Sequence, residues 1–295
     1  MTLQGRILKN YNGYYYVDCG GSIYTCKVKG RLKQNRFSLA TGDIVAVEQG
    51  AAGEGMIKEI LPRKNFLLRP TIANLDLLVL TFACVSPDFS FLIADKLIAM
   101  AERADVPLIL VLNKCDLDSS EHLALLRSVY ENIGYEVYIT AAKKNIGIDA
   151  LRQRLRGKIC AFGGPSGAGK SSTINAIDGS VLLRTGEVSE KIGRGRHTTR
   201  YSQLLPFDEG FIADTPGFGN VLMEQWQESE LARCFREFAA FEDGCRYRPC
   251  THTHEPVCGV KEALAGGRIA ASRYQSYTSI LEEIKILQGK EGKRL

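Results

Sequence analysis

Alternating apolar and polar positions dominate the first 65 residues. The alternating stretches are short and separated by glycine-rich or Asn-Gly turns, and none of them shows strong helical periodicity. Five short strands in so short a segment predict a small closed β-barrel such as an OB-fold, in a first domain of residues 1–65. The expected strands are Gly5–Lys9, Tyr14–Asp18, Ile23–Val28, Asp43–Glu48 and Gly55–Ile60.

After residue 70, continuous apolar runs replace the alternation. Such runs are typical of parallel strands covered on both faces, and here they alternate with stretches of helical periodicity. This order of elements predicts a doubly wound α/β domain over residues 70–220. The expected strands are Leu75–Phe82, Pro107–Leu112, Glu136–Thr140, Lys158–Gly163 and one that ends at Asp214; the expected helices are Phe91–Arg103, His122–Asn132, Ile148–Leu155 and one that begins at Ser172.

A cysteine- and histidine-rich segment lies in the remaining part, residues 221–295, between helical stretches at Glu228–Phe241 and Ala271–Leu287. Its spacing is C-x4-C-x-H-x5-C, which suits a tetrahedral structural zinc site. His254 is an alternative to His252 as the histidine ligand. The sequence therefore predicts a zinc-binding helical module. Its expected ligands are Cys245, Cys250, His252 and Cys258.

A phosphate-binding P-loop, GxxxxGK[ST], follows the strand that ends at Gly163. Glycines let backbone N–H groups face phosphate oxygens, and the N-terminus of the next helix adds partial positive charge. Lys170 can reach the β- and γ-phosphates, and the Ser171 hydroxyl can bind Mg²⁺. The residues expected to contact the nucleotide here are Gly164, Pro165, Ser166, Gly167, Ala168, Gly169, Lys170, Ser171 and Ser172.

An NKxD sequence, Asn113, Lys114, Cys115 and Asp116, ends a second apolar strand. The Asp116 carboxylate can accept hydrogen bonds from both N1–H and the N2 amino group of guanine. Adenine offers no such pair of donors, so the motif predicts a guanine nucleotide and disfavours an ATPase. The loop after Thr140 occupies the position of a Ser/Thr-Ala-Lys loop, where the Ala142 N–H would face the guanine oxygen.

Two further segments after the P-loop fit the switch regions of a GTPase. Residues 191–200 are glycine-rich and basic, and Thr198 or Thr199 could bind Mg²⁺ and the γ-phosphate. An ordinary flexible basic loop is the alternative reading. The DxxG sequence that follows places Asp214 near Mg²⁺ and the Gly217 N–H near the γ-phosphate.

Together these motifs resemble a GTPase in a changed order, because the guanine motifs precede the P-loop. The chain resembles the RsgA/YjeQ family of circularly permuted GTPases over nearly its full length. The matching segments are NKCD at 113–116, GPSGAGKSS at 164–172, GRHTTR at 195–200, DTPGF at 214–218 and the Cys/His cluster at 245–258. The resemblance implies a bacterial cytoplasmic GTPase that binds the small (30S) ribosomal subunit and its rRNA during late maturation.

The residue after DxxG is Phe218, where Ras-like proteins place a glutamine that orients the attacking water. Phenylalanine cannot do so. His197 is the candidate for that catalytic role, and the resemblance indicates the same residue. The alternative is a solvated or RNA-contacting histidine.

Charge is concentrated in the first segment. Residues 1–69 hold eleven Lys/Arg against five Asp/Glu, a net +6, whereas residues 70–220 carry −1 and residues 221–295 carry zero. A basic module of this kind indicates a polyanionic partner, or else only a soluble basic surface. Its tyrosines could stack on bases, although such residues are also common as half-buried strand positions. They are Tyr14, Tyr15, Tyr16 and Tyr24.

The chain opens with no apolar signal segment, and its longest apolar runs are too short to cross a bilayer. We therefore expect a cytoplasmic, monomeric protein with reduced cysteines. The favoured function is a GTPase that uses Mg²⁺ with GTP, carries one structural Zn²⁺ and acts on the small ribosomal subunit. The alternative is a zinc-dependent RNA-binding protein with a passive guanine-nucleotide switch.

Overall fold

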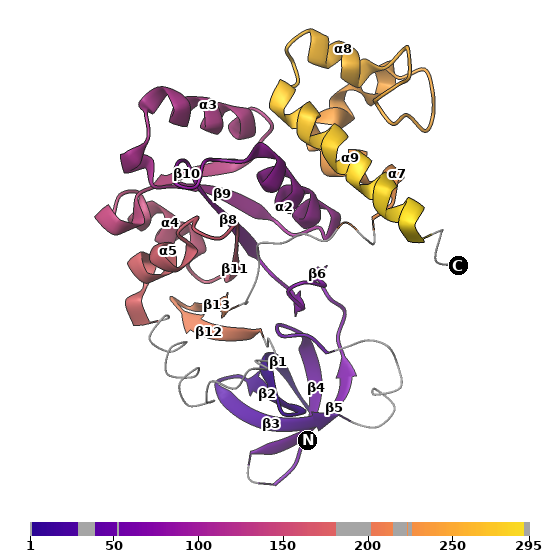
Figure 1. Cartoon of the computed structure of the whole chain (residues 1–295). Coiled ribbons are helices and arrows are strands. Elements are labelled where there is room, and N and C mark those ends of the chain that lie inside the picture. The colour runs from indigo at the N-terminus through magenta and orange to yellow at the C-terminus, as the bar shows by residue number, and fades with distance from the viewer. Residues whose placement is uncertain are drawn as a thin grey trace.

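The computed structural model describes residues 2–28, 39–51, 53–180, 202–214, 223 and 226–291. Figure 1 shows three parts along the chain: a barrel that contains the N-terminus, an α/β sheet with its helices, and a helical C-terminal part beside helix α2. The expected fold class is confirmed. No helix within the described ranges is both long and apolar enough to span a membrane.

The N-terminal barrel is closed by its own strand pairing. β1 pairs with both β2 and β4, β2 pairs with β3, and β5 lies between β3 and β4. The inward positions of the alternating pattern form a small apolar core that includes Ile7, Val17 and Ile57. The strands are β1 (Thr2–Tyr11), β2 (Tyr14–Cys19), β3 (Ser22–Val28), β4 (Ile44–Gln49) and β5 (Glu54–Ile60).

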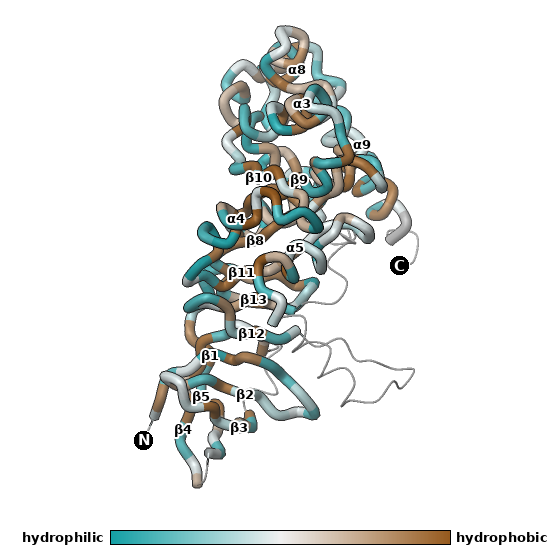
Figure 2. The backbone as a smooth tube through the Cα atoms, turned by 90° about the vertical axis from the view of Figure 1, so that its left-hand side faces the viewer, coloured by the Kyte–Doolittle hydropathy of each residue, from teal (hydrophilic) through white to brown (hydrophobic). Residues whose placement is uncertain are grey.

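The α/β part is a sheet in the order β10-β9-β8-β11-β13-β12, with all but β12 parallel. Its middle strands are almost entirely apolar, and they appear mostly brown in Figure 2. The parallel strands are β8 (Leu77–Ala83), β9 (Leu108–Asn113), β10 (Glu136–Thr140), β11 (Ile159–Gly163) and β13 (Gly210–Asp214).

Helices cover both faces of this sheet. Helices α2 (Phe91–Arg103) and α3 (Ser120–Glu131) bury residues in one core cluster. Helices α4 (Ile148–Leu155) and α5 (Lys170–Ile177) bury theirs in a second cluster on the opposite face. The sequence predicted all four helices, with identical bounds for α2 and α4, while α5 begins two residues before the expected Ser172.

The sequence pattern missed strand β12 (Gln203–Phe207). β12 pairs with β13 through a tight turn in which Asp208 and Glu209 have φ of 42° and 68°. Glycine or asparagine normally signals such a turn, and neither occupies its two central positions. β12 also pairs with β1, which joins the barrel and the α/β part in a single sheet.

The segment between the barrel and the α/β part has regular structure of its own. Two short strands, β6 (Phe66–Leu67) and β7 (Ile72–Ala73), pair with each other there. The Ala73 N–H donates to the Thr41 carbonyl at 2.9 Å, so this hairpin is bound to the segment that precedes β4.

The C-terminal part is helical, but the continuous helix expected at 228–241 is wrong. α7 (Glu228–Leu231) is followed by 3-10 turns at Ala232–Cys234 and Arg236–Gly244. The break occurs at Phe235, where φ is −108° and ψ is 83°, and its ring is buried against other aromatic rings. Helices α8 (Gly259–Ala265) and α9 (Ala271–Glu291) complete the part.

Candidate functional site

The P-loop lies between β11 and α5, as the motif requires. Three of its glycines have positive φ: 137° at Gly164, 79° at Gly167 and 91° at Gly169. A Cβ at Gly164 would lie 2.0 Å from the Thr81 carbonyl oxygen, and one at Gly169 would lie 2.1 Å from Asn113 Nδ2. Backbone conformation and close packing therefore both demand glycine at these two positions.

The Lys170 ammonium lies inside this loop. Its Nζ donates to the carbonyl oxygens of Gly164 and Pro165, both at 2.7 Å. Burial lowers its pKa. The backbone carbonyls thus hold the ammonium at the centre of the loop, where a phosphate oxygen would be a stronger, charged acceptor. The exposed Ser171 hydroxyl follows at the start of α5, which has no side-chain cap at its N-terminus.

Asn113 connects the three loops at this edge of the sheet. Its Nδ2 donates to the Ala168 carbonyl of the P-loop at 3.1 Å. Its Oδ1 accepts from Thr140 Oγ1 at 3.2 Å and from the Ala142 N–H at 3.1 Å. The side chain is 2% exposed, so Asn113 organises the loops from within. The NKxD motif predicts a nucleotide contact for Asn113, and it gives no indication of this bridging role.

The rest of the NKxD sequence lies at the same edge. Lys114 has a φ of 66° and donates through Nζ to the Ser86 carbonyl. Asp116 follows in a short 3-10 turn, and its Oδ2 lies 3.1 Å from Lys144 Nζ. Lys144 belongs to the loop after β10 and was not anticipated. Cys115 is half-buried between them, and burial raises the pKa of its thiol.

Asp214 ends β13, the strand next to the P-loop strand. Its Oδ2 accepts a hydrogen bond from Gln203 Nε2 at 3.2 Å. Gln203 belongs to no sequence motif and was not predicted as a site residue. The other expected switch residues, His197, Thr198, Thr199 and Gly217, lie outside the described residues.

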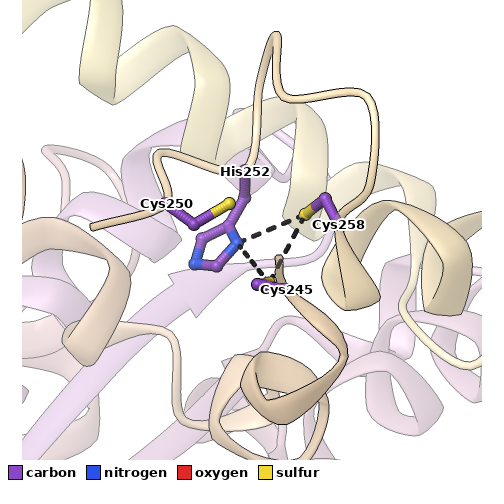
Figure 3. Close-up of side chains that lie close together, drawn as sticks. All are labelled: Cys245, Cys250, His252 and Cys258. Carbon is purple, nitrogen blue, oxygen red and sulfur yellow. Dashed lines mark hydrogen bonds between the residues drawn. The ribbon is translucent and has the colours of Figure 1, made fainter. Parts of the chain in front are cut away.

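The predicted zinc ligands come together at one point (Figure 3). The Sγ and ring nitrogen atoms of Cys245, Cys250, His252 and Cys258 all lie within 4.8 Å of one another. Cys245 Sγ lies 3.8 Å from Cys258 Sγ and 3.6 Å from His252 Nδ1. A tetrahedral ion with Zn–S distances of about 2.3 Å would separate its sulfur ligands by about 3.8 Å, so the residues fit such an ion.

Helix α9 fixes the loop that carries the histidine. Tyr274 and Tyr277 donate through their hydroxyls to the carbonyls of His252 and Thr251, at 2.6 and 2.8 Å. Burial by itself would raise the pKa of Glu255, but hydrogen bonds from Thr251 and Thr253 lower it to about 2. These contacts hold His252 at a φ of 57°. His254 is exposed, and it lies outside the cluster.

The arrangement defines a P-loop GTPase domain in which the guanine motif precedes the P-loop along the chain. The RsgA GTPase family model matches residues 60–224, and the RsgA N-terminal domain model matches residues 4–57. The chain therefore belongs to the RsgA GTPase family.

Relatives with the same organisation cover nearly the whole chain. The small ribosomal subunit biogenesis GTPase RsgA of Alkaliphilus metalliredigens is 41% identical over 285 residues, which are 96% of this chain and 98% of the relative. Its namesake in Caldanaerobacter subterraneus is 42% identical over 284 residues, 96% of each chain.

Two solved structures share the fold. YjeQ from Thermotoga maritima has a TM-score of 0.83 and 34% identity, covering 96% of this chain and 99% of that one. YloQ, described as a circularly permuted GTPase, has a TM-score of 0.80 and 31% identity, covering 97% and 96%. The family resemblance, the permuted GTPase fold and the GTPase activity expected from the sequence are confirmed. The domain boundaries 1–65, 70–220 and 221–295 remain predictions.

Proposed function

We propose that this protein hydrolyses GTP to GDP and phosphate on the small ribosomal subunit and acts in late maturation of that subunit. The observation that carries the proposal is the junction at Asn113, where one buried amide ties the P-loop, the guanine motif and the loop after β10 together. Relatives of nearly full coverage are named small ribosomal subunit biogenesis GTPases. The protein works as a monomer in the cytoplasm.

Different residues at the carboxyl ends of the parallel strands would bind different parts of GTP. Asp116 reads guanine, the P-loop N–H groups and Lys170 bind the phosphates, and the Ser171 hydroxyl binds Mg²⁺. Asp214 would help to hold the same ion. Hydroxyl and carboxylate oxygens are ligands that Mg²⁺ prefers, and bound Mg²⁺ neutralises charge on the phosphate oxygens. His197 orients the attacking water, and Thr198 or Thr199 with Gly217 contacts the γ-phosphate side.

Zn²⁺ is the ion that best suits the cluster at 245–258. Three thiolates and an imidazole nitrogen are soft or borderline ligands, and the separations between them fit a tetrahedron. The role is structural, because all four positions are occupied by protein.

The barrel supplies the rRNA contact. Lys9 Nζ lies 4.5 Å from the centre of the Tyr16 ring, and Lys27 Nζ lies 5.2 Å from that of Tyr14. Val17 points into the barrel, and side chains alternate along β2, so Tyr14 and Tyr16 point outward. The Lys9–Tyr16 and Lys27–Tyr14 pairs therefore share the outer face of the barrel. Basic groups beside aromatic rings suit a single-stranded nucleic acid. Tyr14 is 38% exposed, whereas Tyr15, Tyr16 and Tyr24 are half-buried.

GTP turnover measured with and without purified small subunits tests the function. We expect slow hydrolysis by the isolated protein and strong stimulation by small subunits, but not by large subunits. Lys170→Ala should abolish turnover in both cases, which excludes a contaminating GTPase. Absence of stimulation, with small-subunit binding intact, would support the passive-switch alternative.

A further inference from the structure

Gln203 is the first residue of β12 and lies directly opposite Asp214 in the antiparallel β12–β13 pair. Its Nε2 donates to Asp214 Oδ2 at 3.2 Å. The donor is a neutral amide, so it restricts the orientation of the carboxylate without cancelling its charge. Asp116 differs in this respect, because its partner is the ammonium of Lys144.

The barrel fixes Gln203 from its other side. Gln203 pairs with Lys9 of β1, at the point where the barrel strands join the α/β sheet. The neighbouring Ser202 carbonyl accepts from Thr41 Oγ1 at 2.8 Å, and Thr41 is 5% exposed. The start of β12 is thus bound to two separate segments of the barrel.

We propose that Gln203 is a positioning residue for Asp214, and that the barrel sets its place through β1 and Thr41. The inference rests on the proposed contact of Asp214 with the Mg²⁺ of the nucleotide complex. The barrel would then have a second role besides binding rRNA, which is to position the Asp214 carboxylate toward the proposed Mg²⁺ site.

Gln203→Met tests the first half, because methionine keeps the length of the side chain and removes the donor. The readout is the Mg²⁺ concentration that half-maximally slows release of a fluorescent GDP analogue from the full-length protein. We expect this concentration to rise about tenfold, as is usual when a partner of a metal-contacting group is lost. GDP release in EDTA should stay within about twofold of wild type, because a weakened metal contact changes nothing there.

The matched control is Gln288→Met. Gln288 is another half-buried glutamine, on helix α9 of the C-terminal part, and its Nε2 donates to the Trp226 carbonyl at 2.9 Å. It should leave the Mg²⁺ dependence unchanged. Asp214→Ala distinguishes the proposed metal contact of Asp214 from the positioning role of Gln203. If Asp214→Ala leaves the Mg²⁺ dependence unchanged, the proposed metal role of Asp214 is wrong; if only Gln203→Met does so, the positioning role alone is wrong.

Thr41→Val tests the second half, since valine keeps the β-branched shape and loses the hydroxyl. Thr41→Val should also raise the Mg²⁺ concentration that half-maximally slows GDP release. In the double variant with Gln203→Met, this concentration should be little higher than in Gln203→Met alone. Thr71→Val is the control, because Thr71 Oγ1 makes a similar bond, at 2.9 Å to the Leu68 carbonyl, without touching β12. Wild-type behaviour of Thr41→Val, or additive effects in the double variant, would overturn the role of the barrel.

Discussion

Asp116 has an observed partner, Lys144, and a proposed second partner, the guanine base. Its Oδ2 lies 3.1 Å from Lys144 Nζ, and the carboxylate is 16% exposed. Each carboxylate oxygen accepts more than one hydrogen bond, so the ion pair leaves acceptors for the two guanine donors. In the proposed complex, Lys144 would therefore hold the carboxylate in place and leave it free to accept from guanine.

We predict that Asp116→Asn will change the base preference of the protein. The amide replaces one acceptor by a donor, which opposes the guanine amino group and matches the carbonyl oxygen of xanthine. GTP affinity should fall by roughly 100-fold, the effect of losing a hydrogen bond to a charged group, and xanthosine triphosphate should bind better than GTP. Competition against a fluorescent nucleotide measures both values.

The control for that experiment lies in the same loop. Asp118 pairs with His122 Nδ1 at 2.7 Å and has no place in the proposed nucleotide contacts. Asp118→Asn should keep the wild-type preference for GTP. Retention of that preference by Asp116→Asn would remove the assignment of guanine recognition to this residue.

A buried cluster of charges joins helices α2 and α9. The Arg273 guanidinium lies 2.5 Å from Asp95 and 2.7 Å from Glu237, and both Arg273 and Asp95 are fully buried. Tyr130 Oη also donates to Asp95, at 3.0 Å. Burial raises the pKa of Asp95 even though Arg273 opposes the shift. This buried cluster is therefore one of the contacts between the C-terminal part and helix α2 of the GTPase domain.

Arg273→Met should destabilise the protein by about 3–5 kcal/mol, because it leaves two buried carboxylates without a cation. The folded-state pKa of Asp95, which burial already raises, would then lie further above its unfolded value, so the variant loses more stability as the pH rises from 5.5 to 8. Urea unfolding followed by fluorescence of Trp226, the single tryptophan, measures this at the C-terminal part, where Trp226 is buried.

Arg248→Met is the control for loss of an arginine charge at an exposed position. Arg248 pairs with Asp243 on the surface at 3.3 Å, and its removal should cost well under 1 kcal/mol at either pH. Equal costs for the two variants, or a cost for Arg273→Met that shrinks toward high pH, would contradict the account of the buried cluster.

The Cys/His cluster gives a prediction about metal content. Cys250→Ser should reduce zinc, measured by elemental analysis, from about one ion per chain to nearly none, because a hydroxyl is a poor zinc ligand. GTP affinity should persist, since the P-loop and Asp116 belong to another part of the chain. Cys234→Ser is the control, because Cys234 is a buried cysteine of the same module that lies outside the cluster. This variant should retain about one zinc ion per chain. Zinc retention by Cys250→Ser would exclude Cys250 as a ligand.

Local patterns in the sequence account for most elements and most of the site. Alternation predicted the barrel strands, and apolar runs predicted the parallel strands. The failures occur where distant contacts decide. The aromatic packing of Phe235 interrupts a segment that looks helical, and the β12–β13 turn uses Asp208 and Glu209 without its usual glycine. Lys144 and Gln203 belong to no motif, because only the folded sheet brings them to Asp116 and Asp214.

At the scale of the whole molecule, the barrel and the GTPase domain share one sheet. The segment with a net charge of +6 forms one end of it, and the nucleotide loops lie at the carboxyl ends of the parallel strands. Truncation of residues 1–65 would therefore also uncover the edge of β12. Surface substitutions on the barrel give a cleaner measure of its electrostatic contact with RNA.

We predict that Lys9→Ala and Lys27→Ala will each weaken binding to small subunits and make it less sensitive to salt. Every lysine that neutralises a phosphate releases a counterion, so the slope of log affinity against log salt should fall by about one per variant. Lys58→Ala is the matched control on the same barrel, because Lys58 is already paired with Glu48. Its slope should stay close to wild type. If all three variants kept the wild-type slope, or if Lys58→Ala lost as much as the others, the Lys9 and Lys27 face would not be where the barrel meets RNA.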